Sequence, residues 1–170
     1  NNDSFYITGN VKSTLMPTGY LTDIVTLVHT FTAEYKGDAY TLTSVLKLAP
    51  EEMVIAGLTD IGRLFTISYN AAGVITAETS DLFVPEAFKP EYILSDIQLI
   101  YFPAAALNEN LPADVSVKEY DNGVYAYRDF FAAGQRIISI KYDNADKYAA
   151  NIDFTNFERG YAYRLELLEQ

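Results

Sequence analysis

The stretch ILSDIQLIYFP, residues 93–103, interrupts a chain in which most other segments alternate apolar and polar side chains. Its apolar residues recur instead at the spacing of one face of an α-helix. That face comprises Ile93, Ile97, Ile100 and Tyr101. Asp96 and Gln98 flank this stripe, and we expect them to face water or cap neighbouring backbone. Pro90 suits the first helical turn and Pro103 ends the helix. The fold therefore depends on what this apolar helix packs against.

The segments on both sides of this helix have the two-residue period of β-strands. Before it come YLTDIVTLVHTFTAEY (20–35), YTLTSVLKL (40–48), MVIAGL (53–58), RLFTISY (63–69) and VITAET (74–79). After it come VSVKEY (115–120), VYAYRDF (124–130), RIISIKY (136–142), YAANIDF (148–154) and YAYRLELL (161–168). Short turns such as KGD and DNG join them, and Asn-Gly favours a tight hairpin. We expect consecutive strands to be antiparallel neighbours.

The pattern predicts a mostly β (α+β) fold, an antiparallel meander of about ten strands with one or two helices inserted at roughly 88–111. The helix can plug a strongly curved, incomplete β-barrel or pack outside a sandwich. Clean alternation gives each strand one wet face and favours the first. At 170 residues the chain fits one domain. We expect that domain to span 20–170, with the helical insertion at 81–113 and a partly mobile leader at 1–19.

Composition and motifs favour no enzymatic chemistry. Twelve basic and 23 acidic side chains give a net charge of −11, with no local basic patch, which disfavours binding to nucleic acid. The chain has no cysteine, no HExxH motif and no phosphate-binding loop. The one histidine, His29, lies on an apolar strand face, where a hydrogen-bonded core histidine is the expectation. We therefore predict no catalytic residue, metal or cofactor.

The surplus of inward-facing apolar residues is the positive signal. If the sheet curls, one face of each strand lines a concave surface that the helix covers. Periodicity alone allows either a filled core or a cavity for a long apolar ligand. The candidate lining residues are Leu27, Phe31, Leu42, Leu46, Phe65, Ile67, Ile97, Ile100, Tyr101, Tyr125, Tyr127, Ile138, Ile140, Tyr163 and Leu165.

Two runs carry a resemblance to a known family. GLTDIGRLFTISYNAAGVITAETS (57–80) and ILSDIQLIYFP (93–103) resemble an uncharacterised family of Gram-negative outer-membrane lipoproteins, a domain of unknown function. The resemblance covers roughly residues 20–168, and Phe102 stands where members often have Trp. That family is in turn similar to the lipoprotein carriers LolA and LolB, which have an incomplete β-barrel closed by helices around a hydrophobic cavity.

The resemblance implies a periplasm-facing outer-membrane lipoprotein whose lipid-bearing cysteine precedes Asn1. Its expected cargo is a lipid, a lipoprotein acyl chain or an aryl-polyene lipid, bound or transferred in the cavity. The alternative is a structural or assembly lipoprotein with a packed interior that binds a protein partner.

Overall fold

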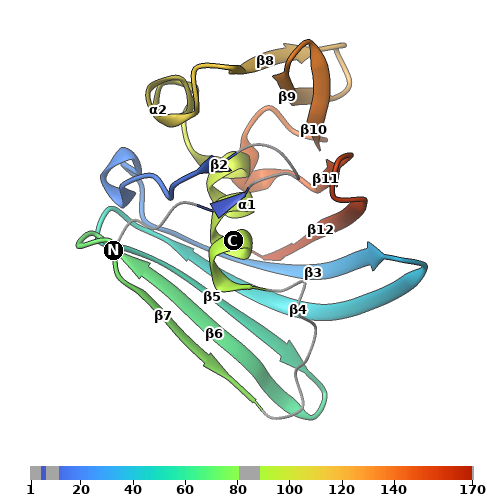
Figure 1. Ribbon diagram of the computed structural model, residues 1–170. Coiled ribbons are helices and arrows are strands. Elements are labelled where there is room, and N and C mark those ends of the chain that lie inside the picture. The colour runs from blue at the N-terminus through green and yellow to red at the C-terminus, as the bar shows by residue number, and fades with distance from the viewer. Residues whose placement is uncertain (1–4, 7–11, 81–88, 170) are drawn as a thin grey trace.

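Within residues 5–6, 12–80 and 89–169, which the computed structural model describes, the chain forms a ten-stranded antiparallel sheet (Figure 1). The first five strands are β3 (Val25–Tyr35), β4 (Asp38–Leu48), β5 (Glu52–Thr59), β6 (Gly62–Asn70) and β7 (Ile75–Thr79). The last five are β8 (Val115–Asp121), β9 (Ala126–Ala132), β10 (Gln135–Tyr142), β11 (Ile152–Asn156) and β12 (Tyr161–Glu169). A separate small sheet pairs β1 (Phe5–Tyr6) with β2 (Lys12–Ser13). The predicted meander is confirmed.

Two meanders share the sheet, and the last strand joins them. The strand order is β7-β6-β5-β4-β3-β12-β11-β10-β9-β8, so β12 pairs with β3 and leaves β7 and β8 at the edges. In the described part of the chain these edges do not meet, and the sheet is not closed into a barrel. Figure 1 shows the sheet curving around a central helix. This arrangement matches the curved-sheet prediction and not the sandwich.

Two α-helices lie in the described residues, α1 (Pro90–Tyr101) and α2 (Ala104–Asn110). Two 3-10 turns, η1 (Thr18–Tyr20) and η2 (Lys147–Ala149), flank the sheet. Pro90 opens α1 and Pro103 precedes α2, as the prolines predict. From Leu94 to its end, α1 is buried on all sides rather than along one stripe. A helix enclosed in this way belongs to the core, since both apolar and polar faces must find partners.

The carbonyl end of α1 is held by side chains from β9 and β10. Arg128, which is 1% exposed, donates from Nη1 to the carbonyl oxygens of Leu99 (2.8 Å) and Phe102 (2.7 Å). The Tyr142 hydroxyl donates to the Ile100 carbonyl at 2.6 Å. The last carbonyls of a helix have no partner within it, so these donors allow the end to be buried.

The N-terminal segment is tied to the middle of the same helix. Gln98, 1% exposed, accepts from the Met16 N–H at 2.8 Å and donates to the Met16 carbonyl at 2.9 Å. We expected this side chain to flank the apolar stripe, facing water or capping nearby backbone; it binds backbone, but far from water. Leu15, Met16 and Thr18 are themselves buried, so the leader expected through residue 19 is part of the core from Leu15. Residues 1–4 and 7–11 lie outside the described residues, as do 81–88 of the predicted insertion.

The Arg128 contacts generate a stability prediction. Arg128→Met leaves the buried carbonyls at the end of α1 without donors and removes the ion pair with Glu119 (2.6 Å), so we expect a loss of about 3 kcal/mol in free energy of unfolding. Urea denaturation followed by circular dichroism measures it. The control, Arg63→Met, breaks an exposed ion pair and should cost less than about 1 kcal/mol. Equal losses in the two variants contradict the proposed role of Arg128.

Candidate functional site, an apolar cavity beneath the central helix

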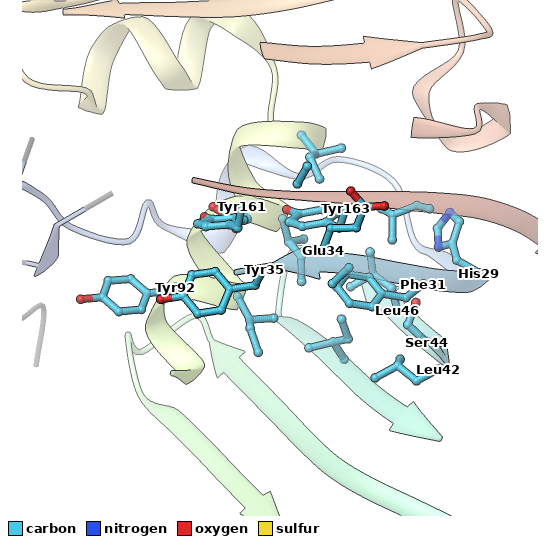
Figure 2. Close-up of a pocket in the computed structure, with 18 of the residues that line it drawn as sticks. His29, Phe31, Glu34, Tyr35, Leu42, Ser44, Leu46, Tyr92, Tyr161 and Tyr163 are labelled. Atoms are coloured by element: carbon cyan, nitrogen blue, oxygen red, sulfur yellow. The ribbon is translucent and has the colours of Figure 1, made fainter. Parts of the chain in front are cut away.

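An apolar cavity of about 100 Å³ lies between α1 and the concave face of β3, β4, β5, β6 and β12. Figure 2 shows side chains of β3, β4, α1 and β12 facing one another around it. At its sheet side, Phe65 of β6 lies directly against Gly57 of β5, where a Cβ would collide with the aromatic ring. A glycine inside a strand commonly serves such a close approach.

Several of the predicted lining residues do surround this cavity: Phe31, Leu42, Leu46, Phe65, Ile97, Ile100, Tyr163 and Leu165. They come from β3, β4, β6, α1 and β12, elements that are distant in sequence and meet because β12 returns to β3. The strand residues among them lie on the face that alternation assigned to the concave surface.

Other predicted lining residues are in the packed core instead. Leu27, Ile67, Ile138 and Ile140 are each at most 1% exposed and lie outside the cavity wall. Tyr101 is also outside it, and its ring stacks on Tyr148 with centroids 5.9 Å apart. Both interpretations of the concave face therefore hold in part: the side near β10 is filled, and the side near β3 and β4 keeps a cavity.

Tyr125 and Tyr127 lie elsewhere, because β9 turns a different face toward the helix. Tyr127 stacks on Tyr120 of β8 with ring centroids 4.9 Å apart, and Lys141 lies 3.9 Å from the centre of the Tyr125 ring. Arg128, the residue that follows Tyr127 in β9, points to the opposite face and donates to the carbonyls at the end of α1. The sequence predicted that the two tyrosines face the helix and that Arg128 faces water, because arginine is usually exposed.

Sequence reasoning missed the polar residues of the cavity wall. They are His29, Glu34, Ser44, Asp96 and Arg159, and the apolar or aromatic residues Ala33, Tyr35, Ile55, Tyr92, Ile93 and Ala162 were also missed as lining. Tyr161 shares the alternating strand face of Tyr163 and Leu165 and also lines the cavity. Asp96 shares the helical face of Ile93 and Ile97 by its spacing, which is the signal that could have found it. Arg159 comes from a turn, and no periodic pattern places it.

Asp96 is a buried carboxyl group at one end of the cavity. It is 8% exposed and accepts a hydrogen bond from the Tyr161 hydroxyl at 2.8 Å, joining α1 to β12. Burial raises the pKa of Asp96 to about 7, against the opposing effects of hydrogen bonds from Tyr161 and Tyr163 and of the charge on Arg159. The expectation that Asp96 faces water or caps backbone is therefore wrong, because tyrosine hydroxyls supply its contacts inside the protein.

His29 marks the other end of the cavity. It is 1% exposed, and both of its ring nitrogens are buried without a hydrogen-bond partner in the described part of the chain. Burial lowers the pKa of His29 to about 4, so the imidazole is neutral at pH 7. We expected a hydrogen-bonded core histidine, and the missing partners correct that interpretation. An unpaired polar group in an apolar site costs free energy.

The two ends of the cavity differ in their exposure. Glu34 is exposed, and Tyr35 and Tyr92 are half-buried, whereas Ser44 beside His29 is 2% exposed. Figure 2 shows His29 and the tyrosines Tyr35 and Tyr92 at opposite ends of the labelled group. The tyrosine end is thus the mouth and His29 is at the deep end.

In the described ranges, no three His, Asp or Glu residues lie close enough together to hold a metal ion. Within the same ranges, no helix has both the length and the apolarity of a membrane span. The arrangement is suited to holding an apolar molecule by burial and a polar group of that molecule at His29.

Replacing the unpaired histidine should stabilise the unliganded protein. His29→Leu removes two buried polar atoms that have no partner within the described ranges, so we expect a gain of about 1–3 kcal/mol in free energy of unfolding at pH 7. Urea denaturation measures it, with Thr30→Val on the opposite face of β3 as a control. A clear destabilisation by His29→Leu is incompatible with an unsatisfied imidazole.

The two buried titratable groups should give opposite pH dependences. Below pH 6.5 the unfolded chain protonates His29 but the folded protein does not until about pH 4, so this group lowers stability as pH falls through that window. Above pH 3.8 the unfolded chain ionises Asp96 but the folded protein keeps the proton until about pH 7, so this group lowers stability as pH rises.

Comparing variants isolates each contribution. The stability of His29→Leu relative to the wild type should increase by about 3 kcal/mol as pH falls from 6.5 to 4. The stability of Asp96→Asn relative to the wild type should increase as pH rises from 4 to 7. Urea unfolding at a series of pH values measures both, and pH-independent differences refute the assigned protonation states.

Comparison with known proteins assigns the chain to a family. No curated protein matches it. A family model described as "Protein of unknown function (DUF3261)" matches residues 26–169, which include all ten strands of the large sheet except the first residue of β3. On that match, the chain belongs to the DUF3261 family of proteins of unknown function.

Proposed function

We propose that this protein binds, and in a membrane setting transfers, a molecule with a long apolar chain in the cavity beneath α1. The observation that supports the proposal is the cavity itself, an apolar space between helix and curved sheet with polar groups at its two ends. Each methylene that leaves water for such a site contributes about 0.8 kcal/mol. No catalytic role is proposed for the residues around it.

The size of the cavity adds a mechanical requirement. About 100 Å³ is well below the roughly 300–1,000 Å³ typical of ligand pockets. A long chain can enter only if α1 shifts away from β3 and β4. Such a shift meets the least resistance at the helix N-terminus, where Tyr92 and Ile93 are half-buried, because the other end is held by Arg128. The described form is then the closed form of the carrier.

The resemblance to LolA-like and LolB-like carriers supports a finer proposal. Under it, the protein is a lipoprotein on the periplasmic face of the outer membrane, tethered by a lipid on a cysteine upstream of Asn1. Its cargo is a lipid, a lipoprotein acyl chain or an aryl-polyene lipid. Signal-peptide processing and palmitate labelling of the full reading frame test the anchor separately from ligand binding.

The alternative is an assembly protein with a packed interior that binds a protein partner. It is favoured by the small cavity and by the filled side near β10, where Ile138 and Ile140 are fully buried. The two proposals differ in one measurable property, because only the carrier must take up an apolar ligand.

A cavity-filling variant tests the carrier. Ala33 lines the cavity and is 7% exposed, so Ala33→Leu places a larger side chain where the ligand should lie. We expect the variant to fold with unchanged or higher stability and to lose at least tenfold in affinity for the apolar dye N-phenylnaphthylamine. Fluorescence titration measures the affinity, and native mass spectrometry of the purified wild type identifies co-purified lipid.

The matched control is Ala56→Leu, since Ala56 alternates with the cavity-lining Ile55 and faces the other side of β5. It should bind the dye like the wild type. If the wild type carries no lipid and binds no dye, or if Ala33→Leu binds as well as Ala56→Leu, the carrier proposal fails and the packed assembly protein remains.

A further inference from the structure

We propose that the ligand of this cavity is a single-chain amphiphile that enters head-first, with an uncharged hydroxyl head that hydrogen-bonds to His29 at the deep end. This inference deepens the proposed function and rests on it. It adds the chemical class of the ligand, its direction in the cavity and the residue that selects its head group.

The first step is the position of His29. Its side chain lines the cavity, is 1% exposed and has two ring nitrogens with no partner among the described residues. Its neighbours across the sheet are Ser44 on β4 and Leu167 on β12. Buried polar atoms in native proteins almost always have hydrogen-bond partners. Two ring nitrogens without a described partner inside a cavity therefore indicate that a bound molecule supplies the partner.

The second step is the direction of entry. Tyr35, at the mouth, lies six residues from His29 along β3, a separation of roughly 20 Å at about 3.3 Å per residue. The wall between them is apolar and contains Phe31, Leu42 and Leu46. A polar group that reaches His29 must therefore lead the molecule in, and the apolar chain follows toward the mouth.

The third step is the charge of the head group. A carboxylate at His29 would need an imidazolium to balance it, and both ions would lose their hydration in an apolar site. Burial also keeps His29 neutral. A neutral imidazole offers one N–H donor and one nitrogen acceptor, and a hydroxyl group has both complementary functions. The other acidic and basic residues of the wall lie toward the mouth. Glu34 is next to Tyr35 at the end of β3, and Arg159 lies over the Tyr92 ring. Asp96 accepts from Tyr161, which pairs with Tyr35.

The test uses ligands of one chain length that differ only in the head group. Hexadecanol, hexadecane and hexadecanoate compete with N-phenylnaphthylamine for the tag-free wild type, His29→Leu, His29→Gln and the control Thr30→Val. The wild type, His29→Gln and Thr30→Val should prefer hexadecanol over hexadecane by about tenfold, since glutamine also donates and accepts. His29→Leu should lose that preference while still binding hexadecane.

The single histidine of the chain provides a second readout. Nitrogen NMR of ¹⁵N-histidine-labelled wild type should show the imidazole resonances move on addition of hexadecanol and stay in place with hexadecane. An unchanged preference in His29→Leu, unmoved resonances, or tighter binding of hexadecanoate than of hexadecanol each overturn the head-group assignment. If no compound displaces the dye from any variant and the dye itself does not bind, the proposed function fails instead.

Discussion

The hydrogen bonds from Arg128 to the last carbonyls of α1 are the interaction on which the arrangement of this protein depends. A helix that is buried on all sides must satisfy its free carbonyl groups inside the protein, and water cannot do so. Arg128 and Tyr142 supply those donors from β9 and β10. They thereby attach the second meander to a helix that also covers the first, and a single curved sheet encloses α1.

One face of α1, from Tyr92 to Ile100, lines the cavity. There the helix presents Asp96 and Ile97 to the sheet, and Tyr161 links Asp96 to β12. Burial raises the pKa of the Asp96 carboxyl in this wall to about 7 and lowers the pKa of the His29 imidazole to about 4, and the imidazole has no partner among the described residues. Polar groups retained at a cost to stability are commonly functional, and here they lie at the two ends of one apolar space.

Alternation and turn residues were sufficient to predict the strands, the meander and the proline-bounded helix. They also identified Phe31, Leu42 and Leu46 as lining residues, because each strand face there is uniformly apolar. The same rule failed at Tyr125 and Tyr127, which lie outside the cavity wall, while the adjacent Arg128 of β9 faces the helix. The carbonyl groups at the end of α1 need buried donors, and this requirement outweighed the preference of arginine for water. Because α1 is distant in sequence from β9, no local pattern could predict it.

By itself, then, the sequence determined the secondary structure, its order and the existence of an apolar concave face, since these follow from short-range periodicity and turn chemistry. The tertiary structure decided which part of that face is filled and which is hollow. It also decided that Gln98 binds the backbone of Met16 and that His29 has no partner among the described residues. Those outcomes depend on packing and hydrogen bonding between segments far apart in the chain, which become neighbours when β12 returns to β3.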